Sequence, residues 1–259
     1  MPPATTRSKA DPPRRSRPQR VAEAIKQWVV ERGLRPGDRL PGEAELIERF
    51  AMAKSTIREA VRILEAQGLV KTRTGPGGGV FIHEVSEERA AALLGNYFYF
   101  KTLTIGEIYE LRRALEPELG AALAGKLAPE QLDRLEATIR NYESPARTAE
   151  EERRQHIESL RFHARLAEMS ENALMRFLIR FTANMLSEIT ITRGLYDPPN
   201  HELWARGRDY QVRLVAALRA GDADAARDIL RAHMDTARRL MEGQEDRVVR
   251  RFLPETPIF

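Results

Sequence analysis

Five polar residues around position 58 have the types and spacing to bind nucleic acid. They lie off the buried stripe of a helix predicted at about 55–67, in which Ile57, Val61 and Leu64 recur at helical intervals. Arginine and lysine donate hydrogen bonds to guanine O6 and N7, and serine or threonine can bond a phosphate or a base edge. A solvated basic helix face is the alternative interpretation. The five residues are Lys54, Ser55, Thr56, Arg58 and Arg62.

The elements around this helix favour the nucleic-acid interpretation. Helices are predicted from about Val21 to Gly33 and over 43–50, with a Pro- and Gly-containing turn at 34–41 between them. Two short strands, 69–73 and 80–82, then flank a glycine-rich turn. Three helices and a hairpin outline a winged helix-turn-helix whose third helix enters the major groove. The turn and the wing add further expected DNA contacts, at Arg39, Arg73, Gly77 and Gly78.

Composition and charge exclude several classes of protein. The 259 residues include no cysteine, so disulfides, thiolate metal sites and thiol nucleophiles are absent. No apolar run approaches the roughly 18 residues of a membrane span, and we expect a cytoplasmic protein. The net charge of +4 is uneven, because residues 1–83 hold 16 basic and 9 acidic residues while the remainder hold 26 and 29. A basic unit that binds a polyanion therefore precedes a mildly acidic unit.

The second unit is helical throughout by its 3.6-residue apolar spacing. Bundles of antiparallel helices build small-molecule sites from inward side chains. The fold class is therefore mainly α, an N-terminal winged helix-turn-helix with a small hairpin plus an all-α bundle of about seven helices. The helices are predicted at 87–102, 105–126, 129–142, 148–169, 172–195, 199–220 and 222–245.

These patterns divide the chain into five segments. The first 19 residues are Pro-rich, basic and aperiodic, which is typical of a disordered arm. The full division is an arm at 1–19, the DNA-binding domain at 20–83, a linker at 84–88, the helical domain at 89–245 and a tail at 246–259.

Residues 20–83 resemble the GntR family of bacterial transcription regulators. The likeness lies in PGDRLP at 36–41, TIREA at 56–60, GLV at 68–70 and GVFI at 79–82. It implies that Arg58 and Lys54 reach the operator and that the wing enters the adjacent minor groove. The family usually has arginine at the positions of Ala44 and Lys54, so the operator is expected to differ from the commonest family site.

The helical unit resembles the FadR-type effector domain, through LRRALEP at 111–117, Phe162-His163 and His233. The resemblance implies that Arg112 binds a carboxylate effector. A surface i,i+4 pair between Arg112 and Glu116 is the alternative. Asn184, which is polar among apolar neighbours, is a weaker candidate for the pocket.

Many such domains hold a divalent metal with one aspartate and three histidines, and here only His163 and His233 match that set. The other two positions are Ser159 and Gln211, and helical spacing points all four inward. Without a carboxylate to balance a dication, the set predicts a metal-free pocket that hydrogen-bonds the effector directly, with metal ligation by the two histidines as the alternative.

The sequence thus predicts a homodimeric transcription regulator that binds a near-palindromic operator under the control of a small organic acid, with no enzyme activity and no membrane partner. A metal-dependent enzyme is disfavoured because neither His83-Glu84 nor His201-Glu202 continues as H-E-x-x-H. A ligand-blind architectural DNA-binding protein is the other alternative.

Overall fold

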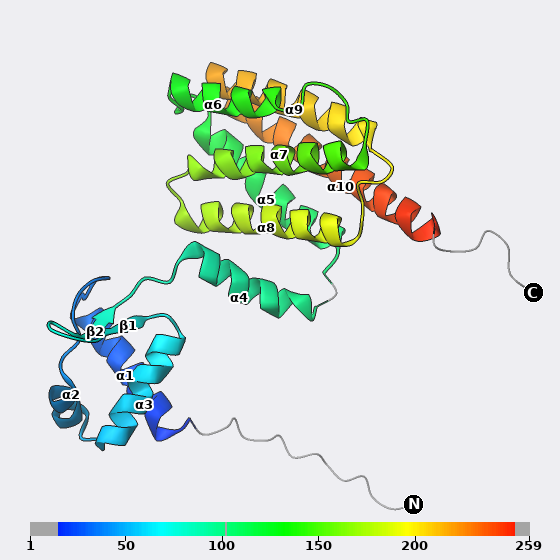
Figure 1. Cartoon of the computed structure of the whole chain (residues 1–259). Helices are drawn as coiled ribbons and strands as arrows, with labels where there is room; N and C mark the ends of the chain where they lie inside the picture. The colour runs from blue at the N-terminus through cyan, green and yellow to red at the C-terminus, as the bar shows by residue number, and fades with distance from the viewer. Residues whose placement is uncertain (1–14, 102, 252–259) are drawn as a thin grey trace, which may run out of the picture. The chain divides into compact units, whose positions relative to one another are not determined.

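A computed structural model describes residues 15–101 and 103–251, so most of the predicted arm and residues 252–259 lie outside the described part. The chain divides into two compact units, Met1–Ala90 and Ala91–Phe259. The described residues form helices and one antiparallel hairpin (Figure 1), which confirms the predicted fold class. The predicted linker at 84–88 runs into α4 (Glu87–Tyr99).

The first unit is a three-helix core with a hairpin. Its helices are α1 (Arg17–Glu31), α2 (Glu43–Phe50) and α3 (Lys54–Ala66), followed by β1 (Val70–Arg73) and β2 (Gly79–Ile82). Val70 pairs with Ile82 and Arg73 with Gly79 in the antiparallel register. The core collects one apolar stripe from each helix, because residues at i, i+3 and i+4 share a helical face. Ile25, Leu46, Ile57 and Leu64 are at most 1% exposed.

Two helix starts differ from the sequence prediction. The α1 helix begins at Arg17 rather than near Val21, because Ser16 caps it and forms a capping box with Gln19. The α3 helix begins at Lys54 after Ala53, which offers no side-chain cap. Thr56 therefore lies within the first turn of the helix.

Seven helices make up the second part of the described chain, as predicted. Figure 1 shows α6 beside α9 and α7 beside α8, with α5 and α10 passing behind them. The helices α5 and α10 pack closely at Gly120, where a Cβ would meet Leu230 Cδ1 at 2.5 Å and force that side chain to shift. Beyond α4, the helices are α5 (Ile105–Leu123), α6 (Pro129–Arg140), α7 (Ala149–Glu168), α8 (Ala173–Thr192), α9 (His201–Ala220) and α10 (Ala223–Arg251).

The last helix corrects the predicted start of the tail. It continues to Arg251, whereas the sequence prediction ended the helical domain at 245. Tertiary contacts extend it, since Gln244 is 1% exposed and its amide donates to the carbonyl oxygens of Leu195 and Pro198. One turn later, Val248 packs against the apolar cluster that contains Leu195.

None of the described helices is both long enough and apolar enough to cross a membrane.

The turn between α2 and α3 leads to a stability prediction. Ala51 ends α2 in the left-handed conformation, at φ 49° and ψ 45°, which costs an L-residue with a Cβ about 1–2 kcal/mol. Glycine avoids that strain but loses more entropy on folding. Ala51→Gly should therefore raise the free energy of unfolding of this unit by about 0.5 kcal/mol or more.

Hydrogen–deuterium exchange of α2 and α3 measures the change locally. Ala44→Gly is the matched control, because Ala44 is exposed within the same helix and glycine there should weaken it. Equal destabilisation by both substitutions would contradict the assigned strain at Ala51.

Candidate DNA-binding surface and effector cavity

The predicted DNA contacts on α3 lie on its solvent face. Lys54, Ser55, Arg58 and Arg62 are exposed and Thr56 is half-buried. The opposite face is buried through Ile57, Ala60 and Leu64. The basic face is therefore available to a phosphate backbone or to base edges, which is what a major-groove helix requires.

An acidic residue on α2 pairs with Lys54 and Arg58, the two residues expected to reach the operator. Glu43 Oε1 lies 3.0 Å from Lys54 Nζ, and its Oε2 lies 2.6 Å from Arg58 Nε. The hydrogen bonds from Arg58 and Lys54 lower the pKa of Glu43 below its ordinary value. Because all three side chains are exposed, these pairs are weak. The pairs orient both cationic side chains, and contacts to phosphate or guanine can readily replace them.

The other four residues predicted to contact DNA make structural contacts within the wing. They are Arg39, Arg73, Gly77 and Gly78. Arg39 donates from Nη2 to the Gly78 carbonyl oxygen at 2.6 Å, and the Arg73 guanidinium lies 4.6 Å from the Phe81 ring centroid. Gly77 has φ +76°, and a Cβ at Gly78 would meet the Arg73 carbonyl oxygen at 2.6 Å. Both glycines therefore shape the turn, and Arg39 ties the segment between α1 and α2 to the wing tip.

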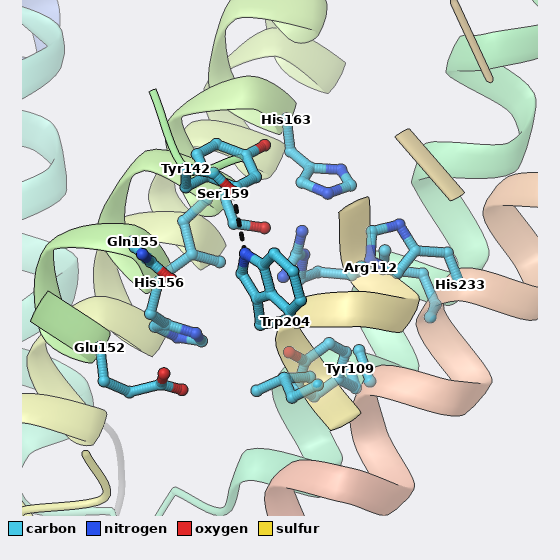
Figure 2. A pocket seen from close by; sticks show the side chains of 15 residues that line it. Tyr109, Arg112, Tyr142, Glu152, Gln155, His156, Ser159, His163, Trp204 and His233 are labelled. Atoms are coloured by element: carbon cyan, nitrogen blue, oxygen red, sulfur yellow. Dashed lines mark hydrogen bonds between the residues drawn. The ribbon is translucent and has the colours of Figure 1, made fainter. Parts of the chain in front are cut away.

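A cavity lies among α5, α7, α9 and α10, with a volume of about 40 Å³. Figure 2 shows its side chains converging from these helices, with Arg112, His163 and His233 on one side and Glu152 and His156 on the other. Of the predicted effector residues, Arg112, Ser159, His163 and His233 line it.

A buried ion pair forms one wall of the cavity. Arg112 donates from Nε to Glu116 Oε1 at 2.5 Å, and Glu116 Oε2 lies 2.5 Å from His163 Nδ1. The three side chains are at most 2% exposed, so the surface pair weighed in the sequence analysis is wrong. Burial alone would raise the pKa of Glu116, but the charges of Arg112 and His163 hold it at about 2. Glu116 is therefore ionised and accepts the Nδ1 proton of His163.

Arg112 keeps one unused donor. Its Nη2 is buried, and within the described residues it has no hydrogen-bond partner. The guanidinium also lies 5.3 Å from the Tyr109 ring centroid, which leaves its edge free for a planar acceptor. A carboxylate is the group that matches a buried guanidinium edge best.

Gln211 lies next to the predicted pocket residues rather than lining the cavity. It is fully buried, and its Nε2 donates to Ser159 Oγ at 3.1 Å and to the Ser159 carbonyl oxygen at 3.3 Å. The same amide nitrogen lies 3.4 Å from His163 Nε2, and Tyr142 Oη donates to Gln211 Oε1. The backbone carbonyl fixes the amide orientation, because it can only accept.

This arrangement does not fit the metal that the family resemblance implies. An amide NH₂, which cannot ligate a metal, faces His163 Nε2, and the Gln211 oxygen is committed to Tyr142. In the described part of the chain no three His, Cys, Asp or Glu side chains gather as a metal-binding group. The rings of His163 and His233 still lie close, with centroids 5.0 Å apart.

Sequence reasoning missed part of the lining. Tyr142, Glu152, His156 and Trp204 all line the cavity. For His156 a signal existed, since His156, Ser159 and His163 follow i, i+3, i+7 spacing along one helical face. Burial, and to a lesser extent the charge of Arg112, lowers the pKa of His156 to about 4, so its ring is neutral at pH 7.

Asn184 is the candidate that the structure places elsewhere. It is exposed on α8 and faces a groove lined by α4 and α8, not the Arg112 cavity. Its apolar neighbours Phe177 and Phe181 stack on each other along the same helix, with centroids 6.0 Å apart. This polar residue among apolar ones therefore marks an exposed helix edge and does not line the Arg112 cavity.

A basic-faced winged helix joined to a helical unit with a polar cavity defines a ligand-responsive DNA-binding regulator. The family model for bacterial regulatory proteins of the gntR family matches residues 18–82, and the FCD domain model matches residues 107–236. The chain belongs to the GntR family of transcription regulators, and its helical unit is a FadR-type effector-binding domain.

Curated relatives agree with this assignment, and a solved structure agrees with the fold. The chain is 26% identical to HTH-type transcriptional regulator LutR of Bacillus subtilis, over 81% of this chain and 94% of that protein. It is also 26% identical to the putative L-lactate dehydrogenase operon regulatory protein of Escherichia coli, covering 86% and 87%. The structure of Streptococcus agalactiae GntR matches its fold at a TM-score of 0.56 and 23% identity, over 86% and 99% of the two chains.

The position of Arg58 leads to a DNA-binding prediction. Arg58→Ala should weaken binding to a DNA site selected from a random library at least tenfold, because a lost base contact costs about 1–3 kcal/mol. Fluorescence anisotropy with labelled duplex measures the affinity. Arg231→Ala removes the same charge from an exposed position on α10 and should leave it unchanged. Equal affinities for the Arg58 variant and the parent would contradict this role of α3.

The donor set leads to a metal prediction. Dialysis against EDTA should leave the melting temperature unchanged, because Gln211 and Ser159 supply no charged ligand. The double substitution Ser159→Asp with Gln211→His restores the family's ligand types and should gain a Zn²⁺-dependent rise in melting temperature. A large fall for the parent protein after EDTA treatment would show that a metal is bound.

Proposed function

We propose that this regulator is controlled by a small organic acid whose carboxylate binds the free edge of Arg112. The observation that carries the proposal is that Arg112 lines a cavity while its buried Nη2 lacks a partner in the described part of the chain. A buried, unpaired donor costs about 1–3 kcal/mol. A carboxylate would relieve that cost and would bind as a charge-assisted pair.

Ser159, His163 and His233 complete the proposed site. Burial, followed by the charge of His163, lowers the pKa of His233 well below its ordinary value, so its ring is neutral at pH 7. The neutral imidazole of His233 and the hydroxyl of Ser159 can orient a ligand through hydrogen bonds without competing with Arg112 for its charge. Gln211 supports the site from behind by fixing Ser159 and His163.

The proposed DNA complex contains two copies of the chain on a near-palindromic operator in the cytoplasm. Lys54, Ser55, Thr56, Arg58 and Arg62 would contact the major groove, and the wing with Arg73 would contact the minor groove. Arg39, Gly77 and Gly78 would position that wing. The effector would change the spacing of the two recognition helices, which alters affinity through the geometry of the half-sites.

Both rival functions fit the structure less well. An architectural DNA-binding protein has no use for a buried cavity with an unpaired guanidinium nitrogen. For an enzyme, the relatives and the matched families are transcription regulators, and we infer that the cavity binds its ligand without converting it.

A conservative substitution tests the role of Arg112. Arg112→Lys keeps the charge beside Glu116 but removes the planar fork, so it should weaken binding of simple acids at least tenfold while the fold persists. Isothermal titration calorimetry with acetate, propanoate and 2-hydroxypropanoate measures the dissociation constants. Arg113→Lys is the matched control, because Arg113 is half exposed and pairs with Asp235 on the outside of the unit. Unchanged affinity in the Arg112 variant would refute carboxylate capture.

A further inference from the structure

One face of α7 carries a second group of unused polar atoms. Glu152, Gln155 and His156 precede Ser159 by one to two turns, and all four line the Arg112 cavity. Glu152 Oε2, Gln155 Oε1 and His156 Nε2 are buried, and none has a hydrogen-bond partner within the described residues. Figure 2 shows Glu152 and His156 entering the cavity from the side opposite Arg112.

These atoms are held in place by their other contacts. Glu152 Oε1 accepts from the Asn200 backbone amide at 3.2 Å, and Gln155 Nε2 donates to the Ser144 carbonyl oxygen at 2.8 Å. Each of these cavity-lining side chains therefore keeps one acceptor oxygen buried and, within the described residues, unpaired. Glu152 is only 5% exposed, and burial raises the pKa of its carboxyl group above the ordinary value.

The two ends of the cavity demand opposite chemistry. Arg112 Nη2 offers a donor and a positive charge, whereas the oxygens of Glu152 and Gln155 offer acceptors. A ligand with a carboxylate alone would satisfy the first end and leave two buried acceptors unpaired, which carries its own energetic cost.

We propose that the effector is a bifunctional small acid, with a carboxylate for Arg112 and a hydrogen-bond donor, an ammonium or a hydroxyl group, for Glu152 and Gln155. The inference rests on the proposed function and adds a second subsite that determines specificity. A site built from buried polar groups rejects an analogue that lacks the matching group, because its own atoms are then left unpaired. An ionised Glu152 carboxylate would pair more strongly with an ammonium than with a hydroxyl group.

The size of the cavity limits the ligand. Glu152 and Ser159 are seven residues apart, which corresponds to about 10 Å along the helix axis. The volume of about 40 Å³ accommodates about three water molecules. The suitable probes are therefore acids of two to four carbons in matched sets. Each set contains the unsubstituted acid, its terminal hydroxy derivative and its terminal amino derivative.

The test is calorimetric titration of the full chain with acetate, glycolate and glycine, and with the corresponding three- and four-carbon sets. At least one amino or hydroxy acid should bind at least tenfold more tightly than its unsubstituted counterpart, equivalent to about 1.4 kcal/mol. In Glu152→Gln the advantage of the amino acid should fall below about threefold, while the affinity for the unsubstituted acid stays the same.

Glu150→Gln is the matched control, because it removes the same charge from an exposed position on the same helix and should preserve the preference. Equal affinities within every set would overturn the donor subsite while leaving carboxylate capture by Arg112 intact. A preference that survives Glu152→Gln would also overturn it. Absence of binding by all acids would overturn both the subsite and the proposed function.

Discussion

The buried ion pair of Arg112 and Glu116 is the constraint around which the helical unit is arranged. Taking two charges out of water costs several kcal/mol per ion, and the cost is repaid only when the remaining polar atoms are also satisfied. Glu116 meets this condition, with one oxygen on Arg112 and the other on His163. The contact between Glu116 and His163 therefore links α5 to α7. Arg112 meets the condition only in part, because its Nη2 has no partner within the described residues. This unpaired donor is the basis for assigning the cavity to a ligand.

Gln211 joins elements that a metal ion would join in many members of the family. Its amide connects Tyr142, which follows α6, with Ser159 and His163 on α7. Hydrogen bonds from one amide have fixed directions and carry no net charge. The arrangement therefore has no metal charge to balance. Glu116 pairs with Arg112 and His163 instead of with a metal. The substitutions at 159 and 211 are thus part of one consistent electrostatic arrangement.

Helical periodicity predicted both units, because apolar residues at three- and four-residue intervals must share a buried face. It failed at helix ends, where Ser16 starts α1 early and Gln244 anchors an extension of α10. For the site, inward spacing identified Ser159, His163, Gln211 and His233, which the structure brings together. The acceptor side of the cavity was missed, because unpaired atoms on Glu152 and Gln155 result from tertiary contacts. Asn184 was misplaced for a related reason, since one helix cannot reveal which of its edges faces solvent.

The chain has two tryptophans, and one lies in each unit. Trp28 packs against the core of the winged helix, with the Arg49 guanidinium 5.0 Å from its ring centroid. Trp204 lines the cavity and donates from its indole nitrogen to the Tyr142 carbonyl oxygen at 2.9 Å. Each unit therefore contains its own intrinsic fluorophore. Replacing one indole with phenylalanine leaves the emission of the other as the only tryptophan signal, so that two single-tryptophan variants can report separately on occupancy of the cavity and on the state of the winged helix.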